Sequence, residues 1–139
     1  MLKRFTEEEA LAFLSAGSLG HLGCITQEGP YVVPTNYIFH DGNIYIHSLK
    51  GAKIEALRQN PKVCLQVDKL ENEYKWRSAI AFGQYEEITN PDERYWFMRR
   101  ILVRFPHLTP VESMVSEEEQ DQIVIFRIRI ESVSTVGEG

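Results

Sequence analysis

Residues 31–47 read YVVPTNYIFHDGNIYIH, and this stretch decides the fold class. β-Branched and aromatic residues dominate both of its halves, which predicts strands over 31–39 and 44–47. The segment His40-Asp41-Gly42-Asn43 between them carries the Asp-Gly pair of a tight hairpin, in which glycine adopts a positive φ at low cost. The stretch therefore predicts an antiparallel hairpin.

Outward from this hairpin, alternation and turn residues predict four more strands, over 18–26, 63–67, 76–87 and 123–131. A capping box at Thr6-Glu7-Glu8-Glu9 begins a helix that Gly17 ends, and two further helices are expected over 50–58 and 91–104. Residues 27–30 are expected to form a turn, and residues 69–75 and 105–122 loops. Consecutive hairpins favour a mainly β fold in which six antiparallel strands close into a barrel flanked by helices, with 1–139 as a single domain.

Composition limits the possible functions of this chain of 139 residues. The net charge of −5 argues against a protein that binds nucleic acid or anionic lipid over its whole surface. The longest apolar run, residues 10–14, is too short to span a bilayer, and residues 1–5 do not resemble a signal peptide. Cys24 and Cys64 form no C-x-x-C pair, so we expect a reduced, cytoplasmic protein.

Common catalytic motifs are missing from the sequence. The four histidines share no metal-ligand spacing with one another or with a cysteine, so no metal site is expected. No G-x-S-x-G, G-x-x-x-x-G-K-[ST] or G-x-G-x-x-G occurs, which removes sequence support for hydrolase, P-loop and Rossmann functions.

The segment that follows the hairpin has the chemistry of an anion site. His47 and Ser48 end a strand, and Lys50, Gly51 and Lys53 lead into the next helix. A hydroxyl, two ammonium groups and the free amides of a helix N-terminus suit a dianionic phosphate. The alternative is an ordinary capped helix that carries two solvated lysines.

Two other segments add polar groups close to strands. Pro34 lies within a strand pattern, which indicates an edge strand or a bulge. A proline there removes one ladder donor and can turn neighbouring backbone groups and Asn36 toward a ligand. Residues 76–78, Trp-Arg-Ser, place a cation and a hydroxyl next to a large aromatic ring, and Gly83 further along is a candidate bulge. Each segment taken alone is more often structural than functional.

Taken together, these segments resemble the pyridoxamine 5′-phosphate oxidase-like superfamily of FMN-binding split β-barrels, in particular its nitroimidazole-resistance-like branch. The resemblance runs from about residue 17 to residue 82, with a weaker similarity over 123–136. It is carried by residues 19–23 (LGHLG), 29–34 (GPYVVP), 44–48 (IYIHS), 51–53 (GAK), 60–61 (NP), 76–78 (WRS) and 82–83 (FG).

The resemblance implies a six-stranded split barrel that forms a homodimer and holds FMN at the subunit interface. It implies that Lys53 binds the flavin phosphate, assisted by Ser48 and Gly51 with Lys50 as a second cation, and that His47 faces the ring. His47 then either supplies a proton to substrate as a catalytic residue or only contacts the cofactor. The remaining implied contacts are Pro34, Thr35, Asn36 and Tyr37 beside the isoalloxazine, and Trp76, Arg77 and Ser78 from the partner subunit.

Two departures argue against vitamin B6 oxidation. Ala52 stands where pyridoxamine phosphate oxidases carry an arginine, and the arginine-containing C-terminal substrate motif is missing. We therefore expect a cytoplasmic FMN-dependent oxidoreductase that reduces nitroaromatic or quinone-like compounds, with NADH or NADPH as the candidate electron donor. A non-catalytic module that stores or senses flavin, haem or deazaflavin is the alternative, and an empty dimerising barrel is the third.

Overall fold

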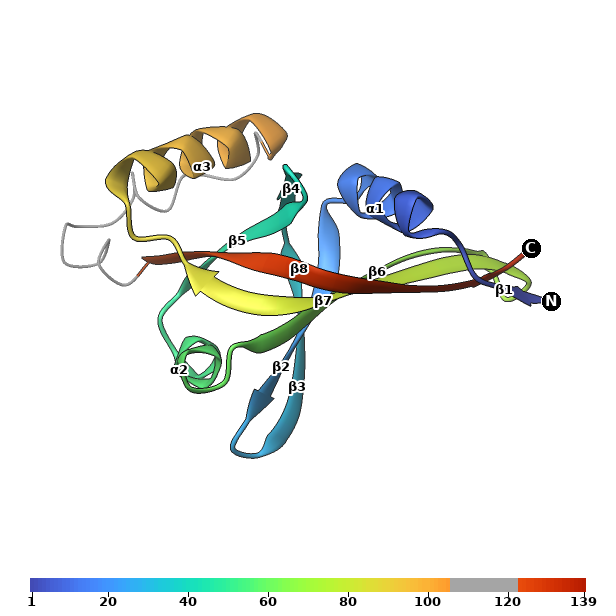
Figure 1. Cartoon of the computed structure of the whole chain (residues 1–139), viewed down its shortest axis with the longest axis horizontal. Coiled ribbons are helices and arrows are strands. Elements are labelled where there is room, and N and C mark those ends of the chain that lie inside the picture. Colours follow the sequence, from blue (N-terminus) through green and yellow to red (C-terminus); the bar gives the residue numbers. More distant parts are fainter. Residues whose placement is uncertain (106–122) are drawn as a thin grey trace.

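In the part of the chain that the structure describes, one antiparallel sheet carries eight strands, and three helices flank it (Figure 1). The computed structural model describes residues 1–105 and 123–139. The elements, in chain order, are β1 (Leu2–Lys3), α1 (Glu7–Ala16), β2 (Leu19–Thr26), β3 (Gly29–Asn36), β4 (Ile38–His40), β5 (Asn43–Leu49), α2 (Ala52–Gln59), β6 (Lys62–Asn72), β7 (Lys75–Glu87), α3 (Pro91–Arg104) and β8 (Ile123–Glu138).

The strand order is β3-β2-β6-β7-β8-β5-β4, with β1 paired to β8. Every pair is antiparallel. The hydrogen-bonded ladder of the described residues is not closed, but its two end strands, β3 and β4, are separated in the chain by Tyr37 alone. The covalent chain thus links the ends of the sheet, and the predicted mainly β, antiparallel split barrel is confirmed.

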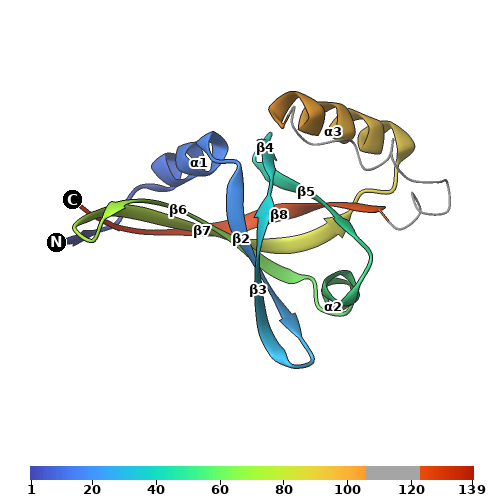
Figure 2. The ribbon, with the colours of Figure 1, turned by 180° about the vertical axis from the view of Figure 1, so that it is seen from behind.

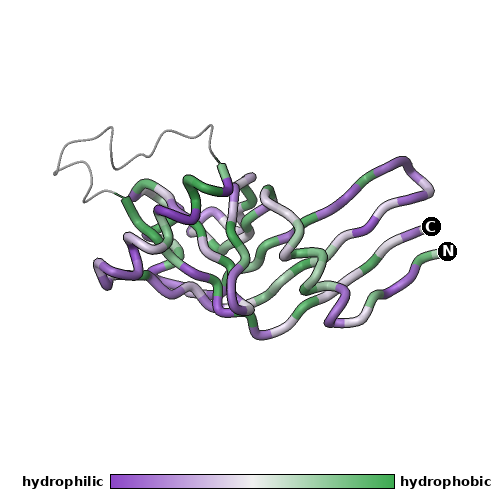
Figure 3. Tube along the Cα trace, turned by 90° about the horizontal axis from the view of Figure 1, so that it is seen from above, coloured by the Kyte–Doolittle hydropathy of each residue, from purple (hydrophilic) through white to green (hydrophobic). Residues whose placement is uncertain are grey.

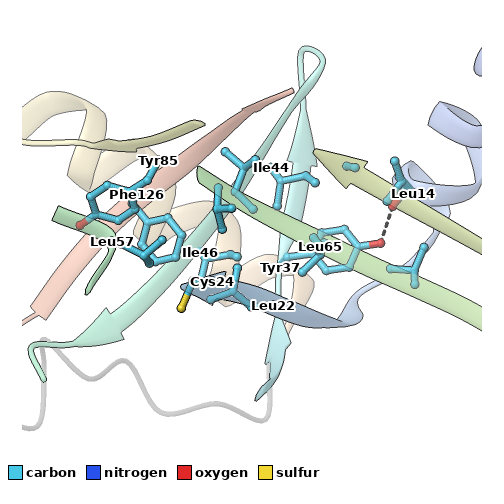
Figure 4. Close-up of a cluster of buried hydrophobic side chains, with 14 of the residues drawn as sticks. Leu14, Leu22, Cys24, Tyr37, Ile44, Ile46, Leu57, Leu65, Tyr85 and Phe126 are labelled. Carbon is cyan, nitrogen blue, oxygen red and sulfur yellow. Dashed lines mark hydrogen bonds between the residues drawn. The ribbon is translucent and has the colours of Figure 1, made fainter. Parts of the chain in front are cut away.

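The predicted number of six strands is wrong, because the expected strand 31–39 is divided and β1 was not foreseen. Tyr37 leaves the ladder: its backbone N–H donates to the carbonyl of Ser18 at 3.0 Å. Its side chain is buried, and the hydroxyl donates to the carbonyl of Leu14 at 2.6 Å (Figure 4). The break therefore follows from one tyrosine that turns into the core.

A second correction concerns the loop expected over 69–75, which is almost entirely strand. β6 continues to Asn72 and β7 begins at Lys75, while β8 runs to Glu138 rather than ending at residue 131. Trp76 pairs with Leu70 on one side and with Glu138 on the other. Polar residues sustain these strands because cross-strand pairing, rather than burial, holds them in place.

The extended ends of β6, β7 and β8 form an arm that reaches away from α2, with both termini beside it (Figures 1 and 2). Figure 3 shows the elongated outline from above, with hydrophobic and hydrophilic segments alternating along the strands. Leu70 and Tyr74 at the arm are about 70% exposed. The arm thus carries apolar side chains that this chain does not bury.

Several local predictions are confirmed. Thr6 and Glu9 form the capping box of α1. Asp41 and Gly42 both have positive φ, at 49° and 79°, as the tight turn requires. A register shift between β7 and β8 lies at Gly83, where a Cβ would overlap the carbonyl oxygen of Arg129, so the expected bulge also has the close backbone approach of glycine.

The apolar residues form two clusters on opposite sides of β5 and β8. The first fills the barrel and includes Leu22, Ile44, Ile46, Leu65 and Phe126, each at most 1% exposed (Figure 4). The second lies beneath α3 and consists of Tyr45, Ile88, Phe97, Met98, Ile101 and Ile125. Helix α3 therefore covers the outer face of β5 and β8 near the end of β5.

Candidate functional site

The N-terminus of α2 directly follows the end of β5 and is open. Gly51 is the N-cap, and no side chain of the described chain caps the helix. A Cβ at Gly51 would meet no atom of the described residues within 4 Å, so the space beside the N-cap is open within this part of the chain. The amides of the first turn are therefore available to an external acceptor, and the helix dipole favours an anion.

Lys53, in the first turn of α2, is half-buried and makes no ion pair within the described part of the chain. Its pKa is lowered, mainly because burial disfavours the charged amine, and the nearby Cys24 thiol acts in the opposite direction. A partly desolvated cation without a carboxylate is unfavourable by itself. An anionic ligand would relieve this cost.

His47 lies at the end of β5, half-buried, with its ring 6.3 Å from that of Phe97 on α3. Its Nδ1 is buried without a hydrogen-bond partner among the described residues. Burial, and then the charge of Lys53, lower the pKa of His47 below its usual range. The imidazole is therefore mainly neutral at pH 7, with one unsatisfied ring nitrogen that can bond to a ligand.

The two other residues predicted at this end contribute less. Ser48 donates its hydroxyl hydrogen to the carbonyl of Leu49 at 3.0 Å, which leaves only the acceptor side of its oxygen. Lys50 is exposed and contributes to the lowered pKa of Glu87 on β7. The structure thus brings His47, Ser48, Lys50, Gly51 and Lys53 to one end of the molecule. Of the two lysines in this group, Lys53 is half-buried and Lys50 is exposed.

The β3 residues fall into different environments. Pro34 is exposed on β3, which pairs with β2 and forms an edge of the ladder among the described strands, as expected from the proline. Thr35 and Asn36 are half-buried, and both donate to backbone carbonyls, at 3.0 and 3.3 Å. The hydroxyl of Tyr37 is occupied by Leu14 inside the core. The side chain of Tyr37 is therefore a structural element rather than a ligand contact.

Trp76, Arg77 and Ser78 belong to the first residues of β7, and this end of β7 lies in the arm, which reaches away from α2 (Figure 1). The guanidinium of Arg77 stacks 4.7 Å from the ring centroid of Phe5, and Ser78 Oγ accepts from Gln66 Nε2 at 3.0 Å. Trp76 and Arg77 line a cleft of about 630 Å³ between the arm and α1. A single chain thus holds the two predicted groups of site residues apart.

A polar network on the outer face of the sheet was missed by sequence reasoning. His21 Nδ1 lies 3.1 Å from Gln66 Oε1, and Gln66 Nε2 donates to both Asp68 and Ser78 at 3.0 Å. Pro34 pairs with His21 across β2 and β3, so the network borders the predicted β3 segment. Only the strand register joins these residues, and alternation alone cannot supply a register.

Side chains on the same outer face remain exposed although they are apolar. Leu19, Ile25, Val32 and Phe82 are between 43 and 67% exposed, and they come from β2, β3 and β7. Isolated exposed apolar residues are normal, but a group on one face of a sheet is typical of a contact surface.

Two absences apply to residues 1–105 and 123–139 only. Over these ranges, no helix is long and apolar enough to cross a membrane. Nor do three or more His, Cys, Asp or Glu side chains come together in a way that could hold a metal ion.

Residues 6–136 match the family model described as pyridoxamine 5′-phosphate oxidase. The chain belongs to this family. The resemblance inferred from the sequence is therefore confirmed, and the model extends it through α1, α3 and β8.

Known proteins of this type have the same fold. A FAD-binding protein from Mesorhizobium loti superposes with a TM-score of 0.81 at 30% identity, covering 100% of this chain and 99% of the other. A structure described as a candidate 5-nitroimidazole antibiotic resistance protein, from Bacteroides thetaiotaomicron, gives a TM-score of 0.76 at 19% identity over 99% and 89% of the chains. An uncharacterized protein of Rhizobium meliloti is 35% identical over 83 residues, which are 60% of this chain and 55% of that protein. The chain thus matches about half the length of that curated relative.

Proposed function

We propose that this protein is a homodimeric FMN-binding flavoprotein that acts as a small flavin-dependent oxidoreductase on nitroaromatic or quinone-like compounds. The observation that carries the proposal is the half-buried Lys53 beside the uncapped N-terminus of α2, with no carboxylate partner in the described residues. The full-length similarity to a FAD-binding protein supports a flavin as the anionic ligand.

The α2 end fits the phosphate of a flavin. The first-turn amides and the Lys53 ammonium would both donate to phosphate oxygens, and Gly51 leaves room for them. Ser48 keeps an acceptor oxygen, and the exposed Lys50 would add charge from the outside. In this proposal Lys53 is the main cation and Lys50 the secondary one.

The β5 and β3 segments would contact the ring. A bound flavin supplies electron or hydride transfer, and the protein tunes it by hydrogen bonds to the ring nitrogens and carbonyls. His47 offers an unsatisfied nitrogen at the end of β5. Because its pKa is lowered, His47 would orient a ligand through a hydrogen bond rather than through a positive charge. On β3, Pro34, Thr35 and Asn36 provide the edge beside the ring.

A second copy of the chain would complete the site. Trp76, Arg77 and Ser78 belong to the part of β7 that forms the arm, and the arm reaches away from α2 (Figure 1). They would therefore reach the same flavin only from a partner subunit. The exposed apolar side chains of the outer face, such as Val32 and Phe82, supply a surface for that partner. A dimer would therefore bury this face and bring both residue groups to one ligand.

The proposal does not include vitamin B6 oxidation, because Ala52 stands where the pyridoxamine phosphate oxidases carry an arginine. FMN is preferred over FAD because the site described here provides for a single phosphate. FAD carries the same ribityl phosphate with an added adenylate group, so both flavins need testing.

The first experiment is the absorbance spectrum of the purified protein, followed by melting curves with FMN, FAD or riboflavin. We expect a yellow protein or, after flavin removal, stabilisation by FMN that riboflavin does not reproduce. At 100 times its dissociation constant FMN should add about 2.7 kcal/mol, or roughly 5–10 °C in melting temperature. A colourless protein whose melting temperature no flavin changes would refute the proposal.

Anaerobic reduction separates an enzyme from a binding module. NADH or NADPH is mixed with the flavin-loaded protein, and a nitroaromatic compound or a quinone is then added. Rapid bleaching by one nucleotide and reoxidation by an acceptor support the oxidoreductase. A flavin that neither nucleotide reduces supports the storage or sensing alternative.

The dimer is tested by sedimentation equilibrium of the wild type and of Val32→Glu. The charge on the outer face should convert the dimer to a monomer and weaken flavin retention. Val103→Glu is the matched control, because Val103 is 84% exposed on α3, and α3 lies away from the β2–β3 hairpin that carries Val32 (Figure 1). A wild type that sediments as a monomer with its flavin retained would contradict the shared site.

A further inference from the structure

A cleft of about 810 Å³ lies between α1, β4 and α3, and none of the residues assigned to the flavin lines it. One wall is apolar and includes Ile38 and Phe39 of β4. The other comes from α3 and includes Tyr95, Trp96, Arg99 and Arg100. This volume is typical of small-molecule sites rather than of macromolecular interfaces.

The two arginines are held by stacking. The Arg100 guanidinium lies 4.5 Å from the ring centroid of Trp96, and that of Arg99 lies 5.7 Å from the ring centroid of Tyr95. Neither arginine makes an ion pair with a carboxylate of the described residues. Stacking leaves the N–H groups at the guanidinium edge without a hydrogen-bond acceptor among the described residues, so both side chains are oriented donors. This is a local positive cluster on a chain with a net charge of −5.

The cleft is rigidly framed. The Trp96 ring packs 4.7 Å from the ring of His40 and edge-on at 5.6 Å against Tyr45. Arg104, in the last turn of α3, donates at 3.3 Å to two carbonyls at the end of α1, those of Ala16 and Gly17. Arg104 therefore fixes α3 against α1, and Arg99 and Arg100 remain the cations available to a ligand.

We propose that this cleft binds a planar aromatic ligand that carries a phosphate, of the class formed by purine nucleotides. Arg99 and Arg100 would bind the phosphate oxygens, where the fork of a guanidinium gives paired hydrogen bonds. The aromatic ring would pack on the apolar wall formed by Ile38 and Phe39. The same chemistry occurs in a free mononucleotide and in the adenylate half of a dinucleotide. The site does not require a bound flavin.

Isothermal titration calorimetry of the purified protein tests the site with AMP, NADP⁺ and adenosine. We expect saturable binding of at least one phosphorylated ligand and binding of adenosine that is at least about tenfold weaker, because adenosine lacks the charge that the arginines would bind. Equal binding of AMP and NADP⁺ supports a mononucleotide site, and binding of NADP⁺ alone supports a dinucleotide site.

The double variant Arg99→Gln, Arg100→Gln should weaken binding of the phosphorylated ligand by about tenfold or more. Arg129→Gln removes an exposed arginine elsewhere, on β8, and should change the affinity less than about twofold. The inference is overturned if neither AMP nor NADP⁺ binds saturably, if adenosine binds as tightly, or if the double variant binds like the wild type. Flavin absorbance recorded on the same samples distinguishes this failure from a failure of the flavin proposal.

Discussion

The α2 end of the molecule and the β7–β8 ladder differ in whether their polar and charged groups have partners within the described residues. In the ladder, Glu86 accepts from Arg127 Nε at 2.8 Å and from Arg129 Nε at 2.7 Å, and these bonds lower its pKa. At the α2 end, Lys53 has no carboxylate partner and His47 Nδ1 has no hydrogen-bond partner among the described residues.

The difference in pairing between the two regions matters for the stability of the fold. A paired surface ion contributes a little stability, whereas a half-buried group without a partner reduces it. Lys53 and His47 have their pKa values lowered chiefly by burial, and Glu86 has its pKa lowered chiefly by hydrogen bonds. Charged groups that pair with one another within the chain thus stabilise the fold. Polar groups without a partner among the described residues indicate where a ligand is expected.

The largest effect is expected in the ladder, for Gly83→Ala. The new Cβ would overlap the Arg129 carbonyl oxygen at the bulge, so the backbones of β7 and β8 would have to separate. We expect a loss of roughly 3 kcal/mol or more in the free energy of unfolding, measured by urea denaturation. Ser132→Ala, at an exposed position of β8, is the control and should stay within about 0.5 kcal/mol. Equal stability of the two variants would mean that the bulge is not tightly packed.

The next effect is expected at the α2 end, where Lys53→Ala should weaken FMN retention by about 10- to 100-fold. Lys50→Ala should weaken it by less than about threefold, because Lys50 is exposed and more strongly solvated. Equilibrium dialysis measures both affinities.

The unfolding temperature of the flavin-free protein gives an independent test of the role of Lys53. The variant should unfold at the same temperature as the flavin-free wild type or a higher one, because it removes a half-buried charge that no described residue pairs with. Equal FMN retention in the two lysine variants would show that the phosphate is bound elsewhere.

Glu86→Gln removes the carboxylate shared by Arg127 and Arg129 and should cost about 0.5–1 kcal/mol at pH 7. The lowered pKa of Glu86 means that its contribution is complete above about pH 4.5 and is lost as the pH falls through the folded-state pKa. The difference between variant and wild type, followed by urea denaturation, should therefore shrink toward pH 3. Glu28→Gln, in an exposed turn, serves as the control, and a difference that persists at pH 3 would exclude a carboxylate effect.

The smallest effect concerns His47 and the pH dependence of stability. Its folded-state pKa is lower than its unfolded-state value of about 6.5, so the unfolded chain binds more protons between these two values. Stability should thus fall as the pH decreases below about 6.5, and His47→Gln should reduce that slope in the flavin-free protein. Ser48→Ala should keep the wild-type slope. Thermal melts between pH 5 and 8 measure it, and an unchanged slope in His47→Gln would contradict a buried neutral imidazole.

Much of the fold could be predicted because it depends on neighbours in the sequence. The capping box at Thr6, the Asp41-Gly42 turn and the bulge at Gly83 all arise from local conformational preferences. The arm could not be predicted in the same way, since residues 69–75 look polar and loop-like, and only pairing with β7 and β8 keeps them extended.

The candidate site likewise contains residues that local sequence could predict and residues that depend on contacts between remote segments. The anion-binding segment from His47 to Lys53 is contiguous, so its residue types alone indicated it. Tyr37 could not be separated from its neighbours by sequence, because its hydroxyl is directed into the core by Leu14, 23 residues away. The network of His21, Gln66 and Ser78 depends on the register of three strands.

The sequence by itself determined the antiparallel hairpins, the capped helices and the lysine-bearing helix N-terminus, because each is encoded by residue types at short spacing. It also indicated the family, through the resemblance of several short segments taken in their order along the chain. Only the tertiary structure decided that Lys53 and His47 are half-buried without partners among the described residues, that β7 carries Trp76 on the arm, away from α2, and that Arg99 and Arg100 border a cleft. Burial, pairing and distance result from contacts between segments remote in the chain, and local patterns carry no information about them.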